Sequence, residues 1–174
     1  MRWVIIIVIA LVAVIIAIFA TGAVLPRKHI ASVMMRLNQT PQVVWLTVNN
    51  HADDPKWRPE LKSIEKLPER NGHPVWLETY KDGMRLELED IEVDGPRKLV
   101  REVRDTGNMF SGRWQIDITP SGATASTIAI TESGEVPNPF FRFMSRFVFG
   151  HTKSMEQYLT ALAAKFGEKA DLKK

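Results

Sequence analysis

The sequence predicts an α+β domain preceded by one transmembrane helix. Three observations lead to this prediction: an uncharged apolar run near the N-terminus, a series of short alternating segments separated by turns, and one long amphipathic segment near the C-terminus. Alternating segments of this kind form an antiparallel sheet with one apolar face. A single long helix then covers that face, which is an α+β arrangement.

The first element is the apolar run from Trp3 to Leu25, in which no residue is charged. As a helix it would be about 34 Å long at about 1.5 Å per residue, and the hydrocarbon layer of a bilayer is about 30 Å thick. Pro26 ends it. The alternative is a cleaved secretory signal, whose apolar core is shorter, at about 7–15 residues. The length therefore favours a retained anchor over residues 1–27.

The charges that flank this run indicate its orientation. Arg2 precedes the run, whereas Arg27, Lys28 and Arg36 follow it. Positively charged residues concentrate on the cytoplasmic side of membrane spans, and the margin here is about one charge. We therefore expect a single-pass protein of the cell (inner) membrane, with its soluble domain in the cytoplasm.

The composition excludes several classes of function. The chain has 23 basic and 20 acidic residues and a net charge of +3, without the clustered positive charge that a nucleic-acid partner requires. It has no cysteine, which excludes disulfides, thiolate nucleophiles and cysteine-ligated zinc. The four histidines lack metal-ligand spacing and no phosphate-binding glycine motif occurs, so we expect no metal and no cofactor.

The soluble part begins with a strand and two short helices. Residues 28–37 alternate in the manner of a strand. Thr40 is a suitable N-cap for a short helix, and Pro41 is a suitable first residue. Asp53 or Asp54 precedes a second helical turn, which again starts at a proline.

Six further strands follow, and turn signals such as Asn71-Gly72 separate them. The alternation is clear where Met84, Leu86 and Leu88 stand between charged neighbours. The predicted strands are residues 61–67, 74–80, 84–93, 98–105, 113–119 and 124–136.

The last predicted element is a long helix over residues 138–167. Asn138 is its expected N-cap, and Gly167 is placed to end it. No linker or repeat interrupts the soluble part, so we predict one domain over residues 28–168. A charged tail, residues 169–174, follows it.

One face of this helix carries bulky side chains. At 3.6 residues per turn the face holds Phe140, Met144, Phe147, Val148, His151, Met155, Tyr158, Leu159, Leu162 and Phe166. Its first four turns are rich in Phe, Met, His and Tyr, which suit a wall facing a variable ligand. Ordinary core packing against the sheet is the alternative.

Phe149 projects from the opposite side of the helix, among Arg142, Arg146 and Lys153. An exposed aromatic side chain surrounded by cations is typical of helices that lie in the bilayer interface. These four residues are therefore a candidate membrane contact. The alternative is that Phe149 packs under a loop or against the sheet edge.

Four segments carry a family resemblance. They are TPQVVW, DDPKWRPELKSIEKL, FSGRWQIDITPSGATASTIAITESGEV and NPFFRFMSRFVFG. In this order, over residues 29–167, they resemble the START/birch-pollen-allergen (SRPBCC) superfamily, and within it the polyketide cyclase/dehydrase-like proteins.

The resemblance implies a helix-grip fold, in which a curved seven-stranded antiparallel sheet grips the long helix and an apolar cavity lies between them. Members bind lipids, sterols, polyketides and other hydrophobic molecules, and a minority are enzymes. The N-terminal anchor is a difference from the soluble members, and it favours a function at a membrane. Carried over to this chain, the cavity wall would include Trp57, Phe110, Phe140, Met144, Phe147, His151 and Met155.

The leading functional hypothesis is a non-enzymatic, membrane-tethered protein that binds a hydrophobic small molecule or lipid. One alternative is an enzyme of the cyclase/dehydratase type, for which His151 and Glu78 are the candidate catalytic residues. Another is a membrane-associated interaction module whose cavity is filled with side chains.

The polar candidates also have purely structural explanations. His151 also fits an ordinary buried histidine, and we expect Glu78 and Arg101 to form cross-strand pairs on the surface of the sheet. His51 lies close to two aspartates in the sequence, but helix capping explains both acids.

Overall fold

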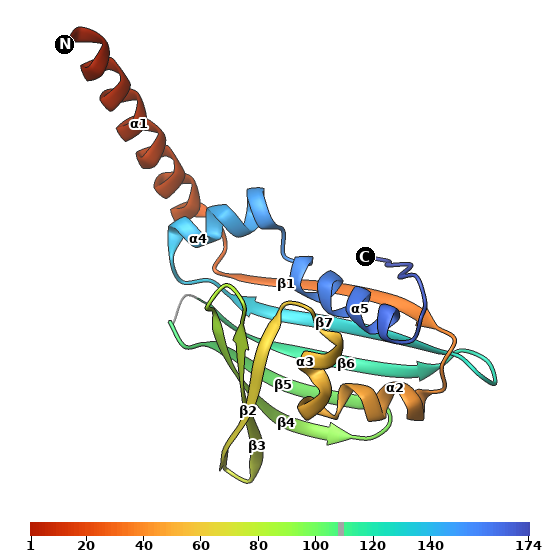
Figure 1. The fold of residues 1–174 in the computed structure, drawn as a ribbon. Helices are drawn as coiled ribbons and strands as arrows, with labels where there is room; N and C mark the ends of the chain where they lie inside the picture. The colour runs from red at the N-terminus through yellow and green to blue at the C-terminus, as the bar shows by residue number, and fades with distance from the viewer. Residues whose placement is uncertain (108–109) are drawn as a thin grey trace.

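The computed structural model describes residues 1–107 and 110–174. It has an N-terminal helix, α1 (Arg2–Val24), that projects from a domain made of one sheet and its covering helices (Figure 1). Residues 108–109, in the loop predicted before the sixth strand, lie outside the described residues.

The sheet has seven antiparallel strands, as predicted, and their order is β1-β7-β6-β5-β4-β3-β2. Irregular pairing interrupts the register between Leu61 and Ser63 and again between Asp90 and Glu92. Such irregularities bend strands. The strands are β1 (Lys28–Leu37), β2 (Leu61–Arg70), β3 (His73–Tyr80), β4 (Arg85–Asp94), β5 (Lys98–Asp105), β6 (Ser111–Pro120) and β7 (Ser126–Glu135).

The helices that cover the sheet are short at one end of the chain and longer at the other. The short ones are α2 (Pro41–Val48), the 3₁₀ turn η1 (His51–Asp53) and α3 (Asp54–Trp57). The longer one is α5 (Lys153–Lys165), which lies across the sheet (Figure 1). Their apolar residues share one core with strands β1, β5, β6 and β7, so the α+β helix-grip fold is confirmed.

A helix near the C-terminus covers the sheet as predicted, but it is not continuous over residues 138–167. α4 (Pro139–Met144) leads into a π-helical turn, η2 (Ser145–Phe149), and the chain then breaks before α5 begins. Gly150 lies at the break with φ +77° and ψ 155°, which is not a helical conformation. Only glycine adopts this backbone conformation without a steric cost. The 3.6-residue periodicity therefore does not carry across this point.

The predicted helix caps are confirmed in the C-terminal region and wrong at the two short helices. The Asn138 side chain accepts a hydrogen bond from the Phe140 amide at 2.9 Å, which confirms the N-cap. Gly167, at φ +71°, ends α5, and the next amide donates back to the Ala163 carbonyl oxygen at 2.9 Å. By contrast, the side chains of Thr40 and Asp53 cap no helix, so the capping explanation for the acids beside His51 is wrong.

α1 docks against α4 through a small contact near its C-terminal end. Gly22 is buried, and a Cβ atom there would lie 1.9 Å from the Pro139 carbonyl oxygen, so only glycine permits this approach. The rings of Phe19 and Phe140 lie 6.0 Å apart. By length and composition α1 could cross a membrane, and a signal sequence near an N-terminus can satisfy the same criterion.

Arg142 fixes this contact. Its Nη1 donates a hydrogen bond of 2.8 Å to the carbonyl oxygen of Leu25, just beyond the end of α1. A cation at a helix C-terminus is favourable because the unpaired carbonyl groups there carry partial negative charge. The side chain is buried, so the prediction that Arg142 contacts the membrane is wrong.

The last residues of the chain pack onto the domain. Lys173 and Met34 exchange two backbone hydrogen bonds of 2.8 Å along the edge of β1. Leu172 and Ala170 pack against the main core. The segment predicted as a charged tail thus covers one edge of the sheet.

Candidate functional site

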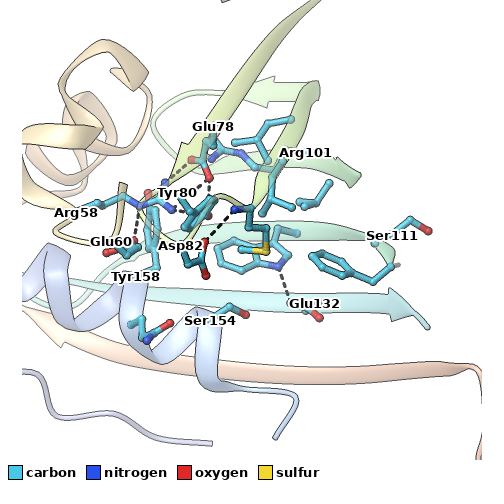
Figure 2. Close-up of a pocket in the computed structure, with 18 residues that line it drawn as sticks. Arg58, Glu60, Glu78, Tyr80, Asp82, Arg101, Ser111, Glu132, Ser154 and Tyr158 are labelled. Atoms are coloured by element: carbon cyan, nitrogen blue, oxygen red, sulfur yellow. Dashed lines mark hydrogen bonds and ion pairs between the residues drawn. The ribbon is translucent and has the colours of Figure 1, made fainter. Parts of the chain in front are cut away.

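A cavity of about 290 Å³ lies between the sheet and the first turns of α5 (Figure 2). Its wall is divided into an apolar side and a polar end. The apolar side chains come from the middle strands of the sheet and from the residues just before β4 and β6: Met84, Leu86, Leu88, Val103, Phe110 and Trp114.

Strand register decides which side chains face this cavity. Glu78 pairs with Leu86, and Trp76 pairs with Leu88. Paired residues on neighbouring strands project from the same face of a sheet. Leu86 faces inward, so Glu78 also faces inward. Glu78 is 1% exposed and Arg101 is 2% exposed, so the expected surface pairing of these two residues is wrong.

Arg58, Glu78 and Tyr80 form the polar end of the cavity. The Arg58 guanidinium binds Glu78 with both terminal nitrogens, and its Nη2 also donates to the Tyr80 hydroxyl at 3.0 Å. That hydroxyl donates in turn to Glu78 Oε2 at 2.7 Å. The third nitrogen, Nε, donates to Glu60 at 2.9 Å. Figure 2 shows the cluster beside the ring of Tyr158.

The pKa values in this cluster follow from burial and from the Arg58 charge. Burial alone would raise the pKa of Glu78, but the nearby guanidinium and its hydrogen bonds outweigh burial and lower that pKa. Burial and the Glu78 charge together raise the pKa of Tyr80. Glu78 is therefore held as a carboxylate and Tyr80 as a neutral phenol.

A second buried set of charges extends this cluster away from the cavity. Arg101 Nε donates to Asp90 Oδ1 at 3.1 Å, and Asp90 Oδ2 is hydrogen-bonded to His51 Nε2 at 2.8 Å. Asp54 lies 3.4 Å from Arg58 Nη1 and 3.7 Å from His51 Nδ1. Asp54 therefore joins the two sets through contacts that are longer than the others.

Tyr158 is a buried polar side chain of the cavity whose hydroxyl has no hydrogen-bond partner among the described residues. It is 1% exposed. Its ring packs edge-on against Trp57 and Trp114 and lies 5.2 Å from Arg58 Cζ. An unpaired buried hydroxyl carries a free-energy cost that a ligand can relieve.

A second cavity, of about 310 Å³, adjoins the first. It is walled in part by α4, η2 and the Gly150 break. Five residues line both cavities, so the two lie side by side: Met84, Phe110, Ser111, Glu132 and Ser154.

Two histidines and Glu132 stand at the wall of this second cavity. Glu132 binds His29 Nε2 at 3.0 Å through one oxygen and accepts from Trp114 Nε1 at 2.7 Å through the other. The ring of His151 stacks on that of His29 with centroids 4.0 Å apart. Burial, and next the charge of His29, lower the pKa of His151, which favours a neutral imidazole.

The seven predicted cavity residues separate into two groups. Phe110 and His151 line the cavities. The other five do not. Trp57 and Met155 are part of the packed core, and Phe140, Met144 and Phe147 lie on α4 and η2 outside the two cavities. For the three residues of α4 and η2 the reason is the Gly150 break, because the helix does not continue from them into α5.

The predicted membrane-contact residues other than Arg142 lie near one another. Arg146, Phe149 and Lys153 are exposed, and the Lys153 ammonium lies 5.9 Å from the centre of the Phe149 ring. Phe149 also lines the second cavity. Phe147 and Val148, predicted to face the sheet, are exposed instead.

Sequence reasoning missed the most polar part of the site. Arg58 and Tyr80 were not proposed as site residues, and Tyr158 was placed on the inward face of the helix without a role. The sequence did contain a signal that Tyr80 faces the cavity. A tight turn follows Tyr80 and pairs its strand with residues 84–88, whose apolar face is clear from the alternation. No comparable signal existed for Arg58, which follows α3 and reaches Glu78 from 20 positions away in the sequence.

The described residues offer no group of three or more His, Cys, Asp or Glu side chains that would hold a metal ion. The arrangement provides an apolar cavity with hydrogen-bonding groups at its inner end and at its mouth. Such a site can bind an apolar molecule and orient a polar group on it.

Comparisons with known proteins agree with this geometry. Residues 37–155, more than half of the chain, match the family described as polyketide cyclase / dehydrase and lipid transport. No curated protein sequence matches the chain.

Several solved structures share the fold at low sequence identity. A START superfamily protein from Mycobacterium smegmatis is 16% identical with a TM-score of 0.63, over 79% of this chain and 96% of that one. The Zhui aromatase/cyclase from Streptomyces sp. R1128 is 11% identical, with a TM-score of 0.67 over 79% and 93%. Truncated norcoclaurine synthase from Thalictrum flavum is 11% identical, with a TM-score of 0.65 over 80% and 93%.

The buried pair of Arg58 and Glu78 predicts a large stability loss when one partner is removed. Glu78→Gln should lower the free energy of unfolding by about 3 kcal/mol, because it leaves Arg58 buried without its main counter-charge. The matched control is Glu87→Gln, which breaks an ion pair with the partly exposed Arg70 on the same sheet and should cost less than about 1 kcal/mol. Denaturant unfolding at neutral pH measures both.

The same pair predicts a pH dependence. Because the folded-state pKa of Glu78 lies below its ordinary 4.5, the pair contributes stability above that pH and loses it as the pH falls through the folded value. The difference between wild type and Glu78→Gln should therefore shrink in acid. A difference that stays constant from neutral pH to the acid transition would contradict the assignment.

Proposed function

The chain belongs to the polyketide cyclase / dehydrase and lipid transport family, and on that premise we propose that it binds a hydrophobic small molecule or lipid while α1 holds it at a membrane. The observation that carries this proposal is the cavity of about 290 Å³ with an apolar wall and a polar inner end. Burying about 300 Å² of apolar ligand surface would contribute about 7 kcal/mol before the costs of association.

Retention of α1 as a membrane anchor is part of the proposal. Three features support it: the length of the apolar helix, its lack of charge, and the specific contact that Gly22 and Arg142 make between the helix and the domain. A signal sequence that is removed has no need of such a contact. The cations after the helix support a cytoplasmic position for the domain.

The proposed ligand has an uncharged or cationic polar group, because the cavity wall is acidic. Two guanidinium groups, those of Arg58 and Arg101, line the cavity, against four carboxylate side chains. A ligand carboxylate placed there would meet net negative charge in surroundings that screen poorly. The Tyr158 hydroxyl, unpaired among the described residues, can donate to a ligand carbonyl group, or donate to or accept from a ligand hydroxyl group. The four acidic residues are Glu60, Glu78, Asp82 and Glu132.

Binding without catalysis is favoured because Arg58, Glu78 and Tyr80 at the inner end hydrogen-bond to one another. Glu78 is a poor base, since Arg58 holds it ionised and lowers its pKa. Tyr80 is a poor acid, since burial and then the Glu78 charge raise its pKa. Both side chains therefore fix the shape and polarity of the cavity end.

A catalytic role is the second candidate, and His151 is the observation that favours it. Its lowered pKa leaves a neutral imidazole at the cavity mouth, where it can accept a proton from a bound molecule. His151→Ala should then reduce turnover on an identified substrate by about 100-fold or more. Undiminished turnover in that variant would remove His151 as a general base.

Filling the cavity should remove the ligand. Val103 lies on β5 in the cavity wall, so Val103→Trp occupies the space that an apolar ligand needs. Native mass spectrometry of the full chain, purified in mild detergent, should show an adduct on wild type that the variant lacks. Val93→Trp, at an exposed valine of β4, is the control and should keep the adduct. An adduct retained by Val103→Trp, or absent from wild type, would count against this cavity as the binding site.

Tyr158 allows the polar contact to be separated from stability. Because its hydroxyl has no partner among the described residues, Tyr158→Phe should leave the unfolding free energy of the empty protein unchanged or raise it by up to about 1 kcal/mol. The same change should weaken retention of the co-purified ligand about tenfold. Tyr80→Phe is the comparison, since it removes hydrogen bonds within the protein and should destabilise it. A Tyr158→Phe variant that loses stability but not ligand would reverse the assignment.

A further inference from the structure

We propose that the π-helical turn η2 inserts into the membrane leaflet in which α1 ends, so that the cavity mouth opens into the lipid interface. The inserting surface is Phe147, Val148 and Phe149, here named the η2 patch. The proposal deepens the proposed function and rests on its claim that α1 is a retained anchor. Its occupant is the bilayer itself.

The η2 patch is an exposed apolar surface with no covering element. Phe147 is 59% exposed, Val148 58% and Phe149 51%, and no residue of η2 is buried. Outside α1, the large exposed apolar side chains of the described residues otherwise stand singly in the sequence. Three adjacent ones mark a site of contact with an apolar surface.

The docking of α1 sets the depth of this region. α4, which leads into η2, contacts α1 at Phe19 and Gly22. Phe19 lies six residues before Leu25, the end of the apolar run, which is about 9 Å along the helix axis. If α1 spans the bilayer, Phe140 lies at that depth beside it. Interfacial helices bury their apolar face by about 5–10 Å, so η2 starts within the interfacial layer.

The charges around the patch fit lipid headgroups. Between Pro137 and Met155 the chain has three cations and no Asp or Glu. Arg142 is used at the end of α1, whereas Arg146 and Lys153 are exposed beside the patch. Cations at this level attract the anionic headgroups of a leaflet. A protein partner is a weaker fit, because α1 already places this surface in lipid.

The same segment walls the second cavity. Phe141, Ser145 and Phe149 line it together with Gly150 and His151. In the inserted position this wall stands between acyl chains on one side and the cavity on the other. An apolar ligand would then pass from the bilayer to the binding site without crossing water, which removes the largest barrier to its exit from lipid.

The absence of native cysteines gives a direct test. Val148→Cys introduces a unique thiol for an environment-sensitive NBD fluorophore, and Val93→Cys places the same label at a valine that is 51% exposed on β4. β4 ends at the side of the sheet away from α1 (Figure 1). The full chain is reconstituted in phosphatidylcholine/phosphatidylglycerol vesicles, with and without a lipid that carries a nitroxide near the headgroup.

The expected result is a blue shift of the Val148 label and loss of its emission when nitroxide lipid is present, with neither change at Val93. Phe147→Cys provides a second label site in the patch and should behave like Val148→Cys. Equal emission at Val148, Phe147 and Val93, in a chain that resists carbonate extraction, would overturn the insertion of η2 and leave the anchor intact. A chain that carbonate releases from the vesicles would overturn the anchor and the inference together.

Discussion

The buried pairing of Arg58 with Glu78 is the interaction on which the arrangement of the site depends. A carboxylate on the concave face of a sheet cannot be covered by an apolar helix, because an unpaired buried charge is far too costly. The short α3 meets this need by carrying Arg58 onto the face of β3. The same contact fixes Tyr80 and leaves the ring of Tyr158 against the guanidinium. The polar end of the cavity is therefore set by charge satisfaction.

Division of the C-terminal helical region gives its two halves different tasks. α5 supplies the apolar face that closes the main core, through residues such as Leu159 and Leu162. α4 and η2 belong instead to the contact with α1, where glycine permits close approach and Arg142 caps the helix end. Because the Gly150 break joins the halves beside His151, the cavity mouth lies next to the part of the domain that is tied to α1.

In the proposed function these features form one path for a ligand. It begins at the η2 patch, passes the stacked imidazoles and Glu132, and ends at the Tyr158 hydroxyl, which no described residue hydrogen-bonds. Apolar side chains line most of the way, so they supply binding free energy without selecting a chemical group. Selection falls to the few polar groups at each end, where an unmatched partner is penalised most.

The sequence by itself determined the elements: the apolar helix, seven strands, short helices led by proline, and the Asn138 cap. These follow from local sterics and from alternation within a few residues, which a linear reading contains. Tertiary structure decided which face of β3 turned inward, because Val75 and Leu77 offered as apolar a face as Trp76 and Tyr80, and only the register with β4 and the reach of Arg58 distinguish them. It also decided that one glycine would break a helix whose periodicity continued past it, because the docking of α4 on α1 lies far outside that local pattern.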